Sequence, residues 1–178
     1  MGDSSLPKIS ELNISLERGI FCRTLIRELA GTLQDIVGLK ESEGYISLVG
    51  RHMGEWINQS YQEQLNQKRL NKQQVIDVLV DLKARIHGDF RVIEQDKTKV
   101  VLRNSRCPFE DQVKNRQCMC MMTSNVFGTI TANNLGYAKV VLEETIAQGD
   151  TECKVIVHFD DTKESALAVG REYFNLDV

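Results

Sequence analysis

Apolar residues recur at helical spacing through the first half of the chain. They fall every three to five positions, which is typical of helices that bury one face. Gly38 and Gly88 stand where the first and third of these segments would end, and Asn71 can cap the start of the third. The pattern predicts helices over residues 13–37, 46–65 and 71–88, with a break at 41–44.

Alternating apolar and polar residues replace the helical spacing after Gly88, which favours strands. Residues 90–104 alternate around a polar turn at 95–97 and predict a β-hairpin. A second hairpin is expected to turn at Gly149, which allows the backbone angles of a tight turn. The remaining expectations are strands over 137–147 and 153–159, an irregular stretch over 105–118, a helix over 119–135, and a short helix or docked tail over 164–174.

These elements predict an α+β fold in which N-terminal helices pack on an antiparallel sheet made of two hairpins separated by a helix. The 178 residues suffice for one domain with a substantial core. We expect a single domain over residues 1–178, with a helical part (11–88), a hairpin-helix-hairpin part (89–160) and a C-terminal helix or tail (161–178).

Composition narrows the partners that this fold could have. Hydrophobic residues make up 42% of the chain and charged residues 26%, as in ordinary globular proteins. The net charge of −3 does not favour direct nucleic-acid binding, and no apolar run is long enough to span a membrane. Residues 1–10 lack the apolar core of a signal peptide, so we expect a cytoplasmic protein.

Four of the five cysteines stand at the edges of predicted elements in the second half of the chain. Edges of this kind can meet at one end of a sheet, where thiols could bind a metal or change redox state. The spacing is not that of a zinc finger, and small buried hydrophobic side chains are the alternative interpretation. The four candidates are Cys107, Cys118, Cys120 and Cys153, whereas Cys22 lies in the first helix and is expected to pack there.

Other candidate ligand-binding residues are scattered over several elements. His52 could line a pocket or contact a haem, although a surface position also fits it. Glu144 or its neighbour Glu143 could join the thiolates if its carboxylate were buried, or be solvated at the sheet edge. Trp56 and Phe127 fit positions in a core as well as in a pocket. Tyr137 is a further candidate ligand-binding residue. No catalytic motif is present, so the pattern alone does not indicate an enzyme.

Several short runs carry a family resemblance. They are Cys107-Pro-Phe, residues 120–128, 134–140 and 142–150 and the strand from Cys153, with weaker similarity over 29–33, 54–58 and 80–83. Together these runs resemble the methanogen output domain family, and the resemblance covers residues 15 to 174. More distantly, the chain is similar to small-ligand-binding domains of the vinyl-reductase type.

The resemblance implies a prokaryotic signalling module and a possible metal site. In related sensors a zinc site uses an upstream cysteine and a last cysteine, which Cys120 and Cys153 match. Thr145 stands in place of the third cysteine and Leu142 near the expected glutamate, so Cys107 would have to supply the missing thiolate. Glu110 replaces a glycine expected after Cys-Pro-Phe.

We therefore expect a sensory module that binds a small ligand or a metal, either zinc or an iron–sulfur cluster, through its cysteines. Its helices would repack and present a surface to a signalling partner or to an identical subunit. Phe21 and Ile26 lie outside the main apolar face of the first helix, which favours a homodimer. The rival functions are a small-amide hydrolase, similar to enzymes acting on thiazoline carboxylates, with Cys107 or Cys120 as nucleophile, and a haem or iron–sulfur redox or gas sensor.

Overall fold

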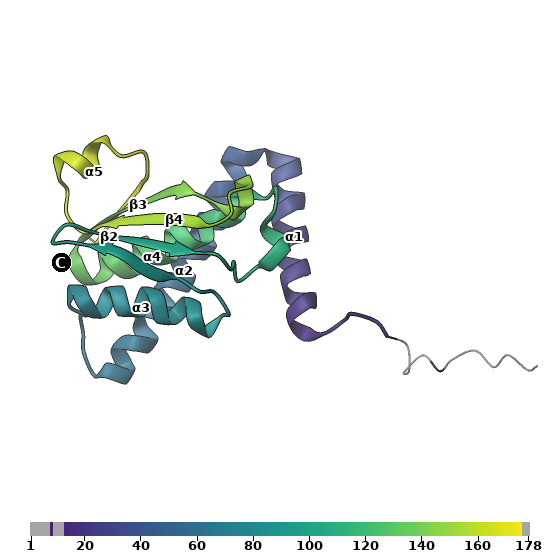
Figure 1. The fold of residues 1–178 in the computed structure, drawn as a ribbon, viewed down its shortest axis with the longest axis horizontal. Coiled ribbons are helices and arrows are strands. Elements are labelled where there is room, and N and C mark those ends of the chain that lie inside the picture. The colour runs from purple at the N-terminus through teal and green to yellow at the C-terminus, as the bar shows by residue number, and fades with distance from the viewer. Residues whose placement is uncertain (1–7, 9–12, 176–178) are drawn as a thin grey trace, which may run out of the picture.

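Helices occupy the first half of the molecule and strands dominate the second, as Figure 1 shows. The computed structural model describes residue 8 and residues 13–175. The predicted α+β class is confirmed. Among the described helices, none is both long and apolar enough to cross a bilayer. The helices are α1 (Arg18–Val37), α2 (Leu39–Leu65), α3 (Lys72–Arg85), α4 (Cys120–Leu135) and the short α5 (Lys163–Leu167).

A five-stranded antiparallel sheet in the order β1-β2-β4-β3-β5 forms the second layer. Both predicted hairpins are present as β1–β2 and β3–β4, and they join where β2 pairs with β4. The strands are β1 (Arg91–Gln95), β2 (Lys99–Asn104), β3 (Tyr137–Glu144), β4 (Cys153–His158) and β5 (Arg171–Phe174).

The helix boundaries follow local capping interactions. Asn71 caps α3 as predicted: its side chain accepts a hydrogen bond from the Gln74 N–H, while the Gln74 side chain accepts from the Asn71 N–H. The predicted break at residues 41–44 is wrong, because one residue, Gly38 with φ of 84°, makes the whole turn between α1 and α2. At the end of α3 it is His87, not Gly88, that takes positive φ.

The C-terminal region differs from both of its predicted forms. Residues 163–167 form α5, but Arg171–Phe174 then pairs with β3 as the edge strand β5. The second hairpin is shorter than predicted, because a 3-10 turn, η4 (Ile146–Gln148), follows β3. Residues 105–119 contain two more such turns, η2 (Glu110–Val113) and η3 (Gln117–Met119).

Helix α4 lies between the sheet and α2. Apolar side chains on one face of the sheet, such as Val100, Val140 and Val157, pack against Phe127 and Ile130 of α4 and against the apolar face of α3. On its other side α4 meets α2, and ten of its sixteen residues are buried. Burial all round explains why α4 lacks the one-sided apolar stripe of a surface helix.

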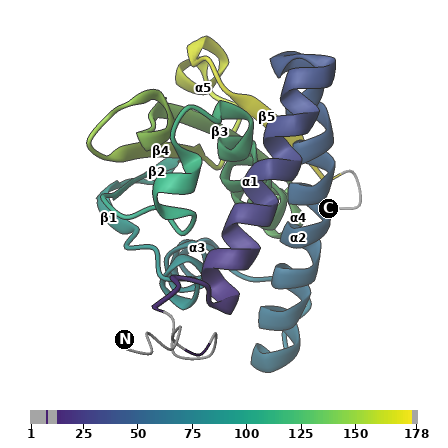
Figure 2. The same ribbon diagram turned by 90° about the vertical axis from the view of Figure 1, so that its right-hand side faces the viewer.

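The outer layer is formed by α1 and α2, which lie side by side in Figure 2. The structure describes all of α1, and its buried residues are just Ala30 and Gly31. Helix α1 crosses one end of the sheet, where it contacts η2 and η3 (Figure 1). The candidate site lies at this same end.

Candidate functional site

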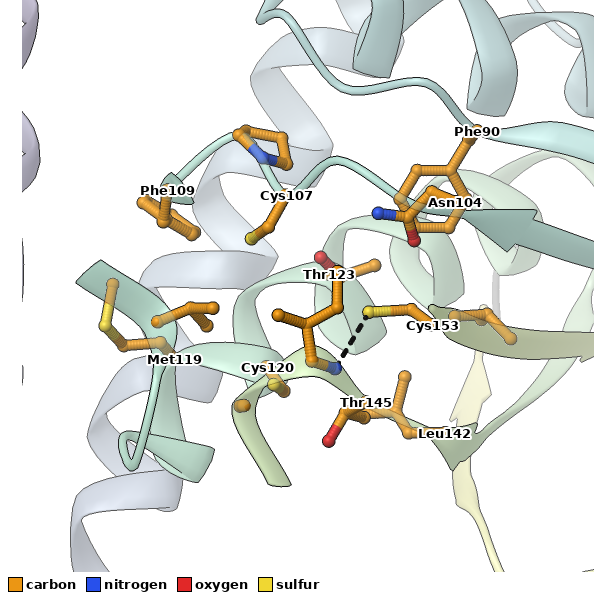
Figure 3. A pocket seen from close by; sticks show the side chains of 15 residues that line it. Phe90, Asn104, Cys107, Phe109, Met119, Cys120, Thr123, Leu142, Thr145 and Cys153 are labelled. Carbon is orange, nitrogen blue, oxygen red and sulfur yellow. Dashed lines mark hydrogen bonds between the residues drawn. The ribbon is translucent and has the colours of Figure 1, made fainter. Parts of the chain in front are cut away.

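A small, mostly apolar cavity lies between the end of the sheet and the start of α4 (Figure 3). Its volume is about 30 Å³. We call it the cysteine pocket, because three of the five cysteines line it. The fifteen lining residues are Phe90, Asn104, Cys107, Pro108, Phe109, Val113, Met119, Cys120, Thr123, Leu142, Thr145, Ile146, Ala147, Cys153 and Val155.

The three thiols reach the cysteine pocket from separate elements. Cys107 follows β2, Cys120 begins α4, and Cys153 begins β4. The Cys153 sulfur accepts a hydrogen bond from the backbone N–H of Ile146 at 3.4 Å. The antiparallel register brings these distant segments together, since β4 pairs with β2 on one side and with β3 on the other.

Burial keeps these thiols protonated. Burial, together with the neighbouring Cys153 and Cys107, raises the pKa of Cys120 to about 12. Burial likewise raises the pKa of Cys107 and of Cys153 above the ordinary thiol value. Because the thiolate is the form that attacks electrophiles and binds metals, these cysteines are poorly suited to nucleophilic catalysis near neutral pH.

A buried lysine lies directly behind the pocket wall. Lys83 of α3 is 4% exposed, and its Nζ donates a hydrogen bond to Thr123 Oγ1 at 2.8 Å. The ammonium also lies over the rings of Phe90 and Phe127, at 5.4 and 5.3 Å from their centroids. Burial lowers the pKa of Lys83 to about 8. Within the described part of the chain, no carboxylate forms an ion pair with it.

One polar atom in the wall of the cysteine pocket has no partner. Asn104 is 1% exposed, and its Nδ2 donates to the backbone oxygen of Arg106 at 3.2 Å. Its Oδ1 is buried without a hydrogen bond among the described residues. The other wall hydroxyl, Thr145 Oγ1, is hydrogen-bonded to Gln148 Oε1 at 3.0 Å.

Residues 105–119, here named the cover segment, close the pocket and also hold α1. Five lining residues belong to this segment, among them Cys107, Phe109 and Met119. On its other side, Arg27 of α1 donates hydrogen bonds to the backbone oxygens of Gln112 and Lys114 at 2.5 and 3.0 Å. The cover segment therefore connects the pocket physically to α1 of the outer helix layer.

Further contacts strengthen the attachment of α1 to the cover segment. Arg23 pairs with Glu110 at 3.1 Å, so the glutamate found in place of glycine after Cys-Pro-Phe binds α1. Cys118 lies in this interface, where its thiol donates to the Ala30 oxygen at 3.9 Å. It is fully buried outside the cysteine pocket, against Ala30, Val113 and Met119.

The other sequence-predicted residues do not meet at the pocket. His52 and Trp56 lie on the solvent side of α2, because Gly50, Gly54 and Asn58 form the side that is buried. The remaining candidates are Phe127 in the main core, Tyr137 against Phe174 on the edge of the sheet, Glu144 in an ion pair with Arg103, and Cys22 exposed on α1.

The described part of the pocket offers no arranged set of ligands for the zinc or iron–sulfur cluster predicted from the sequence. Across residues 13–175, no group of three or more His, Cys, Asp or Glu side chains is arranged to hold a metal ion. A haem, which needs a pocket of several hundred Å³, does not fit the resting cavity of about 30 Å³ unless the surrounding chain moves.

Sequence reasoning missed the polar residues in and behind the wall of the pocket. Lys83 falls seven residues after Ile76, on the face of α3 that is otherwise apolar, and a lysine at such a position was a usable signal. Asn104 and Thr123 gave no comparable signal, because both residue types are common at strand ends and within weakly helical segments.

Comparisons with known proteins place the chain in a family. The model of methanogen output domain 1 matches residues 25–158, so the chain belongs to this family, as the sequence motifs predicted. No curated protein matches it significantly.

Solved structures share the fold at low sequence identity. An Fe(II) unliganded H-NOX protein from K. algicida has a TM-score of 0.54 and 17% identity, covering 85% of this chain and 78% of its own. A point mutant of that protein has a TM-score of 0.54 and 17% identity, and the match covers 86% of this chain and 79% of the mutant's chain. The third structure is a trafficking protein particle complex subunit 3 from Naegleria fowleri, covalently bound to palmitic acid. It has a TM-score of 0.55 and 13% identity, and the match covers 87% of this chain and 98% of the subunit. Family and fold are consistent with a sensory or signalling module.

Proposed function

We propose that this protein is a sensory module that binds a small, mostly apolar ligand in the cysteine pocket. The observation that carries the proposal is the double contact of the cover segment, which walls the pocket on one side and holds α1 on the other. A ligand larger than the resting cavity would displace this segment, and α1 would move with it. Binding then biases the arrangement of the outer helices.

The electrostatics of the pocket support sensing over hydrolysis. Three protonated thiols line the pocket and offer no ready cysteine nucleophile, while the Lys83 ammonium lies behind the pocket wall, held by Thr123. The structural relative with bound palmitic acid offers a precedent for an apolar ligand in this fold.

The coupling can be tested by enlarging one pocket side chain. Methyl methanethiosulfonate converts a thiol to a methyl disulfide, and a Cys22→Ser background removes the exposed cysteine. With a pocket cysteine modified, as verified by mass spectrometry, we expect amide hydrogen exchange in α1 around Ala30 and Gly31 to accelerate, while α4 stays protected.

The control carries Cys107→Ala, Cys120→Ala and Cys153→Ala and keeps Cys22, whose modification should leave α1 exchange unchanged. Unaltered exchange in α1 after verified pocket modification would contradict the proposed coupling. Elemental analysis of the unmodified protein is a second arm. Stoichiometric zinc or iron lost in the triple variant would make the site a metal centre instead.

We further propose that the outer helices α1 and α2 pair with those of a second copy of the chain. Both helices expose large apolar side chains, including Leu29 at 64%, Ile36 at 76% and Trp56 at 63%. Thirteen such residues on the two helices, each roughly half in water, offer on the order of 1,000 Å², more than the about 800 Å² per subunit of a standard interface. Two helical hairpins can bury these faces as a four-helix bundle around a two-fold axis. The thirteen are Phe21, Leu25, Ile26, Leu29, Ile36, Val37, Leu39, Tyr45, Leu48, Val49, Met53, Trp56 and Leu65.

A further inference from the structure

The unpartnered oxygen of Asn104 restricts which ligand the cysteine pocket can hold. A buried acceptor without a donor destabilises the protein, so a ligand that donates to it gains more than the contact alone. The bond from Asn104 Nδ2 to the Arg106 oxygen fixes the amide so that Oδ1 is the atom left without a partner. The side chain lines the cavity beside Cys153 and Thr123, as Figure 3 shows.

Thr123 supplies the complementary donor. Its hydroxyl oxygen already accepts from the Lys83 ammonium at 2.8 Å, which leaves its own proton free to donate. Among the described residues, no acceptor is recorded for this proton. The positive charge behind the hydroxyl polarises it and strengthens the bond that it can donate.

On the premise that this cavity is the ligand pocket of the proposed function, we propose that its ligand carries a small uncharged polar end of the primary carboxamide type. The ligand N–H donates to Asn104 Oδ1, and the ligand carbonyl accepts from the Thr123 hydroxyl. A carboxylate satisfies Thr123 but has no proton for Asn104, and its negative charge faces the Asn104 oxygen.

The size of the cavity fits this polar end alone. A cavity of about 30 Å³ holds about two water-sized groups, which matches the oxygen and nitrogen of an amide. Any longer apolar tail has to displace the cover segment. The polar end of the ligand therefore determines which ligand is recognised, and its apolar tail determines how far the cover segment and α1 are displaced.

The test compares amides with acids of equal length by NMR titration of the full chain. Acetamide and propionamide should produce saturable shifts at the backbone amides of Asn104, Thr123 and Cys153, and acetate and propionate should not. Asn104→Leu and Thr123→Val should each weaken amide binding by about fivefold or more. Thr123→Ser, which keeps the hydroxyl, should retain it, and each variant's spectrum reports whether it is folded.

Carboxylates that bind as tightly as amides would overturn the assignment of the polar end. So would unchanged amide binding in the folded Asn104→Leu variant. If no probe binds but methyl disulfide formation still loosens α1, the polar end is wrong and the sensory proposal stands. If both experiments fail, the sensory proposal fails with it.

Discussion

Lys83 is a charged residue in a buried, largely apolar environment. Its ammonium is surrounded by two aromatic rings, a hydroxyl and three protonated thiols. A pKa of about 8 in the fold, against an ordinary value of 10.5, means that the protonated lysine destabilises the native state. A group with this cost is more often kept for binding than for stability.

We expect Lys83→Met to raise the free energy of unfolding at pH 7 by up to about 3 kcal/mol, partly offset by the lost bond to Thr123. Because the folded pKa is lowered, the unfolded chain binds more protons between pH 8 and 10.5, so the wild type gains stability as the pH rises there. The advantage of the variant should shrink over this window. Urea unfolding at several pH values measures the difference.

The cysteines change the stability of the fold with pH in the opposite direction, so their contribution has to be distinguished from that of Lys83. Their raised pKa values mean that the fold loses stability as the pH rises past the ordinary thiol value of 9.0. The difference between wild type and Lys83→Met cancels this contribution, and Lys97→Met, at the exposed tip of the first hairpin, controls for loss of a lysine. A variant advantage that stays constant from pH 7 to pH 10 would refute the lowered lysine pKa.

At the scale of elements, the contact between α2 and α4 depends on two glycines one turn apart. A Cβ at Gly54 would lie 2.8 Å from the Thr129 Cβ and 3.2 Å from the Val126 oxygen, and one at Gly50 would lie 2.7 Å from the Asn125 Cβ. A buried amide completes the contact: Asn134 donates to Asn58 Oδ1 at 2.7 Å and accepts from the Leu70 N–H at 2.8 Å. Close approach and hydrogen bonding together fix how the two helices pack.

Gly54→Ala should therefore destabilise the fold by about 1–3 kcal/mol, because α2 and α4 have to separate to admit the methyl group. The matched control is Gly44→Ala on the same helix, where nothing lies within 4 Å of the added atom. That change should stabilise the protein by about 0.5–1 kcal/mol through helix propensity. Chemical denaturation distinguishes the two signs, and equal effects at both positions would argue against close packing at Gly54.

Elements with local signals were predicted well, and elements that depend on tertiary pairing were not. Helix α3 and both hairpins carry their own caps, turns and periodicity, so their sequence suffices to define them. Strand β5 has four residues and is held by its pairing with β3, which no local pattern reveals. The missing break at residues 41–44 has a similar origin, since burial of Ser42 keeps that stretch helical despite Gly44.

For the whole molecule, the proposed dimer follows from the exposed apolar surface of the outer helices. The chain should behave as a particle of about twice its 20.2 kDa mass in light scattering at micromolar concentration. Leu29→Glu with Ile36→Glu places charges in the proposed interface and should give monomers. Val169→Glu, at an even more exposed apolar residue beside β5, should not. A monomeric wild-type protein would contradict the proposed dimer.

The convergence of three cysteines at one sheet end could be anticipated from the order of elements, but the character of the site could not. Edges of hairpins and helices naturally gather at the ends of an antiparallel sheet, so Cys107, Cys120 and Cys153 were sensible candidates. Whether thiols meet at metal-binding distance depends on side-chain packing, as does the approach of Lys83 from α3. Neither the distances between the thiols nor the position of Lys83 can be read from the spacing of residues in the sequence.

The enclosure of α4 has a consequence for how this domain can diversify. A substitution in α4 has to satisfy two neighbouring layers at once, whereas α1 is held within its own subunit by its contact with α2 and its attachment to residues 105–119 and buries just Ala30 and Gly31. Descendants of one ancestral chain can thus exchange their docking partners by altering the exposed faces of α1 and α2 while α4 stays unchanged. The residues that bind the ligand and the residues that bind the partner would then evolve on separate helices.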